Sequence, residues 1–195
     1  YDRVNYETPE LNYGVGFNLE LNKNLSVEGT LNPDFSQVES DATRIDINSP
    51  TAINYPEKRP FFNRGIDAMD YQIDVFYSRS INDPSFASKI INQGRKSRLY
   101  VLNAFDEQTP YLVPTQYESF SGIVGKSFSN VIRYQNFINS KTQIGLLASN
   151  RYYEGDAYGN LYGFDALFNF SDVWKFEFEA FLNNNKEPDA DWIDS

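Results

Sequence analysis

The sequence contains no cysteine and no histidine. Without thiols or imidazoles, it cannot form disulfides, zinc fingers, thiol nucleophiles or Ser-His-Asp triads, and it has no imidazole general base. These absences remove the commonest forms of covalent and metal-dependent catalysis. We therefore expect no cofactor and no metal site.

Basic residues are scarce as well, because 17 Lys and Arg stand against 27 Asp and Glu, which gives a net charge of -10. Nucleic acids are bound by clustered Lys and Arg, so we expect no nucleic-acid partner. There is also no run of about eighteen apolar residues, which excludes a transmembrane helix. Low mean hydropathy does not exclude a membrane barrel, because each barrel strand turns half of its residues toward water.

Aromatic residues are abundant, with 14 Tyr and 16 Phe in 195 residues. Such a composition favours β-strands and argues against disorder. The length suits one domain with a core, so residues 1–195 are predicted to form a single β-domain or a fragment of one. Because the chain starts at Tyr1, without Met or a signal peptide, we expect it to be a piece of a longer protein.

Apolar and polar residues alternate with a period of two in several segments. The clearest runs from Trp174 to Asn183, with Trp174, Phe176 and Phe178 on one face and Lys175, Glu177 and Glu179 on the other. The segments Asn12 to Asn22 and Leu25 to Leu31 alternate in the same way and predict an antiparallel hairpin. Further strands are predicted at Arg44 to Ile47, Tyr71 to Ser78, Arg95 to Phe105, Tyr117 to Phe128, Val131 to Ile138, Thr142 to Tyr153 and Leu161 to Phe170.

Two architectures explain this alternation. The first is an all-β antiparallel transmembrane β-barrel, or the N-terminal part of one, because strands of about ten residues are the length that crosses a bilayer at a tilt. The second is a soluble β-sandwich that binds carbohydrate, although soluble strands usually have about five or six residues. Strand length favours the barrel.

Residues 33–70 interrupt the pattern with a long, proline-containing and highly charged segment. A connection of this length in a compact domain is usually functional or folded on its own. We consider two interpretations, a plug inside the barrel and a structural loop packed outside its mouth. In the first, basic residues pair with carboxylates of the wall and aromatic residues anchor the segment by burial. The expected anchors are Lys58, Arg59, Phe61, Phe62 and Arg64.

Three sequence blocks in and around this segment are specific. They read NPDFSQVESD at Asn32 to Asp41, YPEKRPFFNRG at Tyr55 to Gly65, and FYSR at Phe76 to Arg79. In this order and spacing they resemble a bacterial family known as domain of unknown function 5916, and the resemblance extends from residue 12 to about residue 80.

The resemblance implies a protein of the outer membrane of Bacteroidota-like bacteria with a C-terminal β-barrel. Members often carry an upstream module similar to a carbohydrate-binding domain, which we do not find in this chain. The implied partners are outer-membrane lipid and other outer-membrane proteins. Neither a cargo nor a glycan ligand is implied.

The barrel hypothesis assigns a side to each alternating residue. An acidic wall would favour cations, although these carboxylates could instead be solvated or paired with basic loop residues. The lumen-facing wall is predicted to contain Glu20, Glu28, Asp74, Asp165, Glu177 and Glu179. The lipid-facing set is predicted to contain Tyr13, Val15, Phe17, Leu19, Phe164, Phe168, Trp174, Phe176 and Phe178.

Catalysis is not expected. Glu177 and Glu179 lie roughly 7 Å apart on one strand face, a separation found in inverting glycosidases, but any acidic pair two residues apart on a strand has this spacing. The acidic tail 187–194 lacks the glycine and final glutamate of an EF-hand loop, so it predicts no metal site. The functional prediction is a non-catalytic outer-membrane channel, transporter or assembly component, and the alternative is the soluble carbohydrate-binding module.

Overall fold

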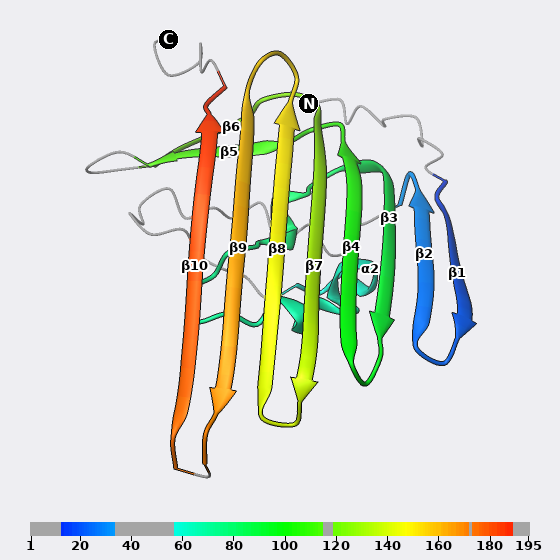
Figure 1. The fold of residues 1–195 in the computed structure, drawn as a ribbon. Helices are drawn as coiled ribbons and strands as arrows, with labels where there is room; N and C mark the ends of the chain where they lie inside the picture. The colour runs from blue at the N-terminus through cyan, green and yellow to red at the C-terminus, as the bar shows by residue number, and fades with distance from the viewer. Residues whose placement is uncertain (1–12, 34–56, 115–118, 172, 189–195) are drawn as a thin grey trace, which may run out of the picture.

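The computed structural model describes residues 13–33, 57–114, 119–171 and 173–188. They form one antiparallel sheet of eight strands and a separate two-stranded hairpin (Figure 1). The strands of the large sheet are, in spatial order, β1 (Val15–Asn22), β2 (Leu25–Leu31), β3 (Pro84–Gln93), β4 (Ser97–Asp106), β7 (Ser127–Asn139), β8 (Thr142–Tyr153), β9 (Tyr158–Asn169) and β10 (Lys175–Lys186). The hairpin consists of β5 (Pro110–Pro114) and β6 (Ser119–Ile123). The all-β antiparallel prediction is confirmed.

The sheet is a meander, in which each strand pairs with the next large-sheet strand along the chain. At one end the strands are joined by the short connections 23–24, 94–96, 140–141 and 170–174, and at the other end lie the short connection 154–157 and the long connections 32–83 and 107–126 (Figure 1). Helical structure is limited to single turns, α2 (Pro60–Asn63), η1 (Ile66–Met69) and η2 (Ser78–Ser80). None of the helices in the described part of the chain is long and apolar enough to cross a membrane.

Strand register sorts the side chains onto two faces. Glu28 pairs with Lys89, Lys89 with Leu102, and Leu102 with Val131, so these four side chains share one face, which we call the inner face. The opposite, outer face carries exposed apolar side chains on strands from β1 to β10. They are Val15, Phe17, Leu19, Leu31, Ile90, Phe105, Ile132, Tyr134, Leu146, Tyr152, Tyr162, Phe164, Phe176, Phe178 and Leu182.

Residues 57–83, which we call the inner segment, lie across the inner face (Figure 1). Their Phe62, Ala68 and Ile81 are buried against the sheet. The sheet residues of this small core are Ala87, Ile91, Tyr100, Leu102, Ala104, Val131 and Leu147. The face that is largely polar is therefore covered, whereas the apolar face is exposed.

The strand predicted at Tyr71 to Ser78 is wrong, because these residues belong to the inner segment and pair with no strand. Their alternation has another cause, since Tyr71 and Val75 pack against the small core beneath the segment. Strand β3 was not predicted. It begins at a proline, and its inner face combines Ala87 and Ile91 with Lys89, so its polarity does not alternate.

Two other boundaries differ from the prediction. β7 begins at Ser127 and includes Ser129 and Asn130, which lie between the two strands predicted at Tyr117 to Phe128 and Val131 to Ile138, and buried Ser129 faces the polar inner side. The predicted strand Tyr117 to Phe128 is instead divided between β6 and β7 by a break at Gly125, whose φ is +86°. The short strand predicted at Arg44 to Ile47 lies outside the described residues.

Candidate functional site

The inner face carries charges of both signs. Glu20, Glu28, Asp165, Glu177 and Glu179 lie on it, as the sequence predicted. Asp74 does not lie on a strand but in the inner segment, because its predicted strand does not form. The same face also carries the basic residues Lys89, Arg98, Arg133, Arg151 and Lys175. The alternation in the sequence places Lys175 beside Glu177 and Glu179, and the other four bases bring this face closer to charge balance than the predicted acidic wall.

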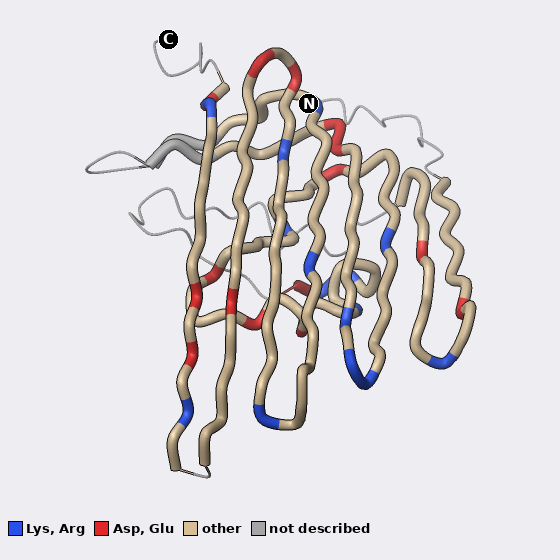
Figure 2. Tube along the Cα trace, viewed as in Figure 1, with Lys and Arg blue, Asp and Glu red and all other residues tan. Residues whose placement is uncertain are grey.

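The charges follow the strand order (Figure 2). Lys89, Arg98, Arg133 and Arg151 lie on the central strands β3, β4, β7 and β8. The carboxylates of the expected wall lie on the flanking strands β1, β2, β9 and β10. The inner segment thus crosses a face whose basic residues, apart from Lys175 of β10, lie at its centre and whose carboxylates, apart from Asp106 of β4, lie at its sides.

Three of the central bases bind carbonyl oxygens of the inner segment. Lys89, whose side chain is fully buried, donates from Nζ to the carbonyls of Phe61 and Arg64, the latter at 2.9 Å. Arg133 Nε donates to the carbonyl of Ala68 at 3.1 Å. Because a buried cation is costly unless it is fully hydrogen-bonded, these donors hold the segment against the sheet.

Arg151 also donates hydrogen bonds to the inner segment, near the end of that segment. Its Nη1 donates to the Ser80 carbonyl at 3.0 Å and its Nη2 to Ser80 Oγ at 2.9 Å. A few residues later, both oxygens of Asp106 accept the backbone N–H groups of Asn82 and Asp83 at 2.7 Å. The segment therefore enters β3 along a path fixed by two strands.

A buried ion pair lies at the centre of the face. Arg133 and Asp165 form a bidentate pair from β7 to β9, with Nη2 to Oδ2 at 2.9 Å. Gly145 of the intervening β8 makes room for it, because a Cβ there would overlap the guanidinium and the carboxylate. The Arg133 guanidinium also lies over the Tyr71 ring, 4.6 Å from its centroid.

The inner segment is bound at the β10 side as well. The Gln72 backbone N–H donates to Glu179 Oε1 at 3.1 Å, and Gln72 Nε2 donates to Glu177 Oε2 at 3.0 Å. Tyr71 contacts Phe181 edge to face, with a centroid distance of 5.4 Å. Two of the predicted wall carboxylates are thus acceptors for the segment.

Of the predicted plug anchors, Arg64 reaches the wall. Its Nη1 lies 2.8 Å from Glu28 Oε1 and its Nη2 lies 3.7 Å from Glu20 Oε1. Phe62 is fully buried, with the Phe61 ring edge-on to it at 5.1 Å. Lys58 is exposed.

Arg59 ties the two ends of the inner segment together. It pairs with Glu57 at 2.8 Å and donates to the carbonyls of Ser78 and Ile81 at 3.0 and 2.6 Å. Its guanidinium also lies over the Phe62 ring at 4.1 Å. The segment therefore has internal bonds that hold its shape, as well as bonds to the sheet.

The Glu57 carboxylate makes this internal tie sensitive to pH. Burial tends to raise the pKa of Glu57, but hydrogen bonds from Arg59 and Ser78 and the Arg59 charge outweigh it, so the pKa lies below its ordinary value. The carboxylate thus stabilises the fold above the unfolded-state pKa of about 4.3, and this contribution is lost as pH falls through the lower folded-state pKa.

We expect Glu57→Gln to lower the free energy of unfolding at pH 7 by about 1.5–3 kcal/mol, the range for a hydrogen bond to a charged group. The variant should also lose stability less steeply than the wild type below about pH 4.3. Denaturant unfolding at pH 7, 5 and 3.5 measures both effects. Asp156→Asn, at an exposed carboxylate, is the control, and equal pH dependence of wild type and Glu57→Gln would contradict the prediction.

The predicted lipid-facing residues lie on the outer face or next to it. Trp174 directly precedes β10, Tyr13 lies two residues before β1, and both are exposed. Phe168 is half-buried beside the rings of Phe170 and Phe176. The remaining members, on the outer positions of β1, β9 and β10, are Val15, Phe17, Leu19, Phe164, Phe176 and Phe178.

Sequence reasoning missed Lys89, Arg133 and Arg151. Each is a single basic residue in an otherwise mixed strand, and its position on the polar face was the one available signal. Each donates to a carbonyl of the inner segment, and no sequence pattern indicates which backbone carbonyl a distant side chain will bind.

The sequence model of the family described as "Domain of unknown function (DUF5916)" matches residues 2–104, which is over half of the chain. The matched range includes β1, β2, β3, the inner segment and most of β4. No curated protein and no solved structure matches the chain.

Proposed function

The chain belongs to the DUF5916 family, and we propose that it is a non-catalytic outer-membrane β-barrel protein, or the first strands of one, that conducts or transports small solutes. In this proposal the outer face contacts lipid, the inner face lines the lumen, and the inner segment is a plug. The proposal rests on the distribution of apolar and polar residues between the two faces.

The main observation behind the proposal is that the polar face of the sheet is covered and the apolar face is exposed, the reverse of a soluble sheet. A soluble antiparallel sheet packs its apolar face on a core and turns its polar face to water. Here Phe17, Leu146 and Phe176 are 52%, 56% and 50% exposed, whereas Glu28, Lys89 and Asp165 are at most 7% exposed. Lipid outside and a polar lumen inside account for this arrangement.

Strand length and end structure agree with the proposal. β7 has 13 residues and β8, β9 and β10 have 12 each, which is enough to cross a bilayer at the tilt of barrel strands. Short turns at one end and longer loops at the other are typical of outer-membrane barrels. Trp174 and Phe170 lie at the short-turn end, where an aromatic girdle would be expected.

The soluble carbohydrate-binding module is less well supported. A β-sandwich would need a second layer over the outer face, and within the described residues the apolar side chains of that face are left exposed. An exposed apolar surface that extends across a whole sheet marks an interface rather than a solvated surface.

Trp174 tests the proposal directly. In a Trp192→Phe background it is the sole tryptophan, so its fluorescence should be strongly quenched when the protein is reconstituted in brominated phospholipid. The matched control carries Trp174→Phe and Phe181→Trp, which moves the tryptophan to an inner position of the same strand, where quenching should be weak. Water-soluble, monodisperse protein without detergent and an unquenched Trp174 would contradict the proposal.

A further inference from the structure

Two hollows flank Arg64 between the inner segment and β1–β2. One is a cavity of about 140 Å³ at the short-turn end, whose lining includes Glu20, Asn22, Ser26 and Gln93. The other is a groove of about 430 Å³ further along the same strands, whose lining includes Gly16, Asn18, Glu28 and Thr30. Arg64 lines both.

The two hollows follow one another along the strands. Ser26, Glu28 and Thr30 are consecutive inner positions of β2, and Glu20, Asn18 and Gly16 are their partners on β1. The first hollow lies at the Ser26 level and the second at the Glu28 and Thr30 levels. From Asn22 to Gly16 the strand rises about 20 Å at about 3.4 Å per residue, which is most of the apolar band of an outer-membrane barrel.

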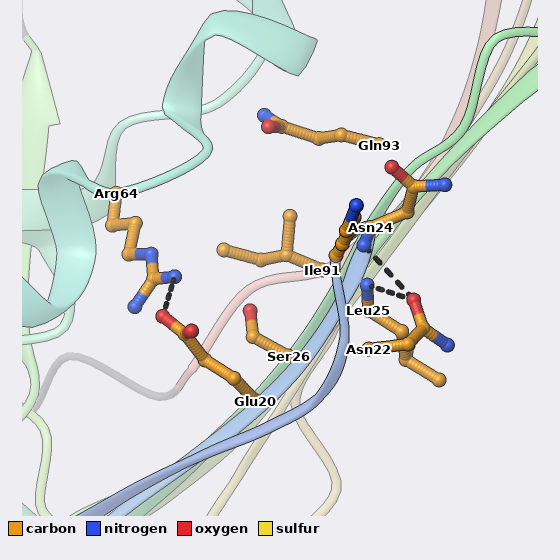
Figure 3. A pocket seen from close by; sticks show the side chains of 9 residues that line it. Glu20, Asn22, Asn24, Leu25, Ser26, Arg64, Ile91 and Gln93 are labelled. Atoms are coloured by element: carbon orange, nitrogen blue, oxygen red, sulfur yellow. Dashed lines mark hydrogen bonds and ion pairs between the residues drawn. The ribbon is translucent and has the colours of Figure 1, made fainter.

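Arg64 closes the space between the hollows. Its guanidinium extends from the inner segment to the wall, toward Glu20 (Figure 3), and lies 2.8 Å from Glu28 and 3.7 Å from Glu20. The side chain remains 44% exposed although Glu28 is 8% exposed. It therefore bridges a water-accessible space rather than filling a core.

The backbone beneath Arg64 is held firmly. Its N–H donates to the Pro60 carbonyl at 3.3 Å, and its carbonyl accepts from Lys89 Nζ at 2.9 Å. Gly65 follows with φ +81°, where a Cβ would lie 2.9 Å from Ile91, so the chain packs tightly there. The Arg64 backbone is therefore constrained, whereas its long cationic side chain extends toward two carboxylates.

We propose that the hollows form a passage for small hydrated ions between the inner segment and β1–β2, and that Arg64 is its constriction and sets its charge selectivity. This inference rests on the proposed barrel function and deepens it. The charged residues that line the two hollows are Glu20, Glu28, Lys23 and Arg64, and buried Lys89 lies 3.2 Å from Glu28, so the wild type has little net negative charge to favour cations.

Removing one charge should therefore shift selectivity in a direction set by its sign. Arg64→Gln removes the positive charge beside Glu20 and Glu28 and should raise the cation-to-anion permeability ratio, whereas Glu20→Gln removes a negative charge and should lower it. One charge at about 4 Å in water is worth about 1 kcal/mol, so each shift should be about fivefold. Arg98→Gln is the matched control, because Arg98 is 43% exposed on the same face but does not line either hollow.

The measurement is the reversal potential of the reconstituted protein in a KCl gradient. A second test uses the lack of cysteine, because single cysteines can be introduced without removing others. Labelling an Asn18→Cys variant with a charged methanethiosulfonate reagent should reduce the conductance, whereas Leu19→Cys, the next residue on the outer face, should be insensitive.

Opposite shifts for Arg64→Gln and Glu20→Gln, with none for Arg98→Gln, support the inference. If Trp174 is quenched by brominated lipid but the wild type conducts no ions, the passage is contradicted and the barrel is not. The same holds if neither substitution changes the permeability ratio. Absence of Trp174 quenching overturns the barrel and the passage together. If Arg64→Gln does not fold, Glu20→Gln and Asn18→Cys still decide the outcome.

Discussion

Replacing Leu146 by arginine should destabilise the membrane-inserted protein by about 2–4 kcal/mol, the cost of a charge near the middle of the lipid-facing surface of a barrel. Leu146 is an outer residue of β8, 56% exposed, between Tyr134 of β7 and Phe164 of β9. If the outer face contacted water, the same substitution at an exposed leucine would change stability by at most about 0.5 kcal/mol. The two environments therefore give clearly different results.

The experiment is reversible denaturant unfolding of wild type and Leu146→Arg in phospholipid vesicles. Ser140→Arg, in the exposed turn between β7 and β8, introduces the same charge away from the apolar surface and should be almost neutral. A Leu146→Arg protein as stable as the Ser140→Arg control would show that lipid does not cover this face.

The faces of the sheet could be predicted from the sequence because the alternation in β1, β2 and β10 is nearly unbroken. In β10, Phe176 and Phe178 point outward while Glu177 and Glu179 point inward, and the structure places all four accordingly. An alternation with a period of two indicates which residues share a face, because successive strand residues point to opposite sides. The alternation does not indicate which face is covered. The position of the inner segment in the structure shows this.

β3 could not be found in this way, because its two faces have similar polarity. Lys89 lies on the inner face beside Ala87 and Ile91, which are apolar because Phe62 of the inner segment packs there. Packing against the inner segment thus explains why polarity does not alternate in β3. In the reverse case, the same kind of packing produced alternation at Tyr71 without a strand.

The contacts of the inner segment were partly predictable. A cationic residue in a long insert and carboxylates on a wall suggest a pair, and Arg64 does pair with Glu20 and Glu28. The remaining contacts join residues far apart in sequence, such as Gln72 and Glu179, which are 107 positions apart. No local pattern encodes such distances, because they depend on the register of every intervening strand.

Charge placement gives the inner segment a definite orientation on the sheet. The central bases Lys89, Arg133 and Arg151 donate to its carbonyls, and on a flanking strand Glu179 accepts its backbone N–H at Gln72. Because the donors lie on β3, β7 and β8 and the acceptors Asp106 and Glu179 lie on β4 and β10, a shift of the segment across the sheet would place carbonyls against carboxylates. The arrangement therefore specifies one position of the inner segment on the sheet.

Asp165→Ala should have the largest effect of any single substitution considered, a loss of about 3–5 kcal/mol in the free energy of unfolding, because it leaves Arg133 buried without its counter-ion. Arg133 is 2% exposed and Asp165 is 7% exposed, so water replaces little of the lost interaction. Gly145→Ala should reproduce much of this loss without removing either charge, since its Cβ would displace the pair.

The pair also supports the inner segment, because Arg133 donates to the Ala68 carbonyl and stacks on Tyr71. Asp165→Ala should therefore speed hydrogen exchange at residues 66–72 more than in the β1–β2 hairpin, as measured by mass spectrometry. The double variant Arg133→Met with Asp165→Leu removes both charges and should be more stable than Asp165→Ala, since paired removal avoids an isolated buried ion. If the two variants are equally unstable, the loss comes from packing rather than from the unpaired charge of Arg133.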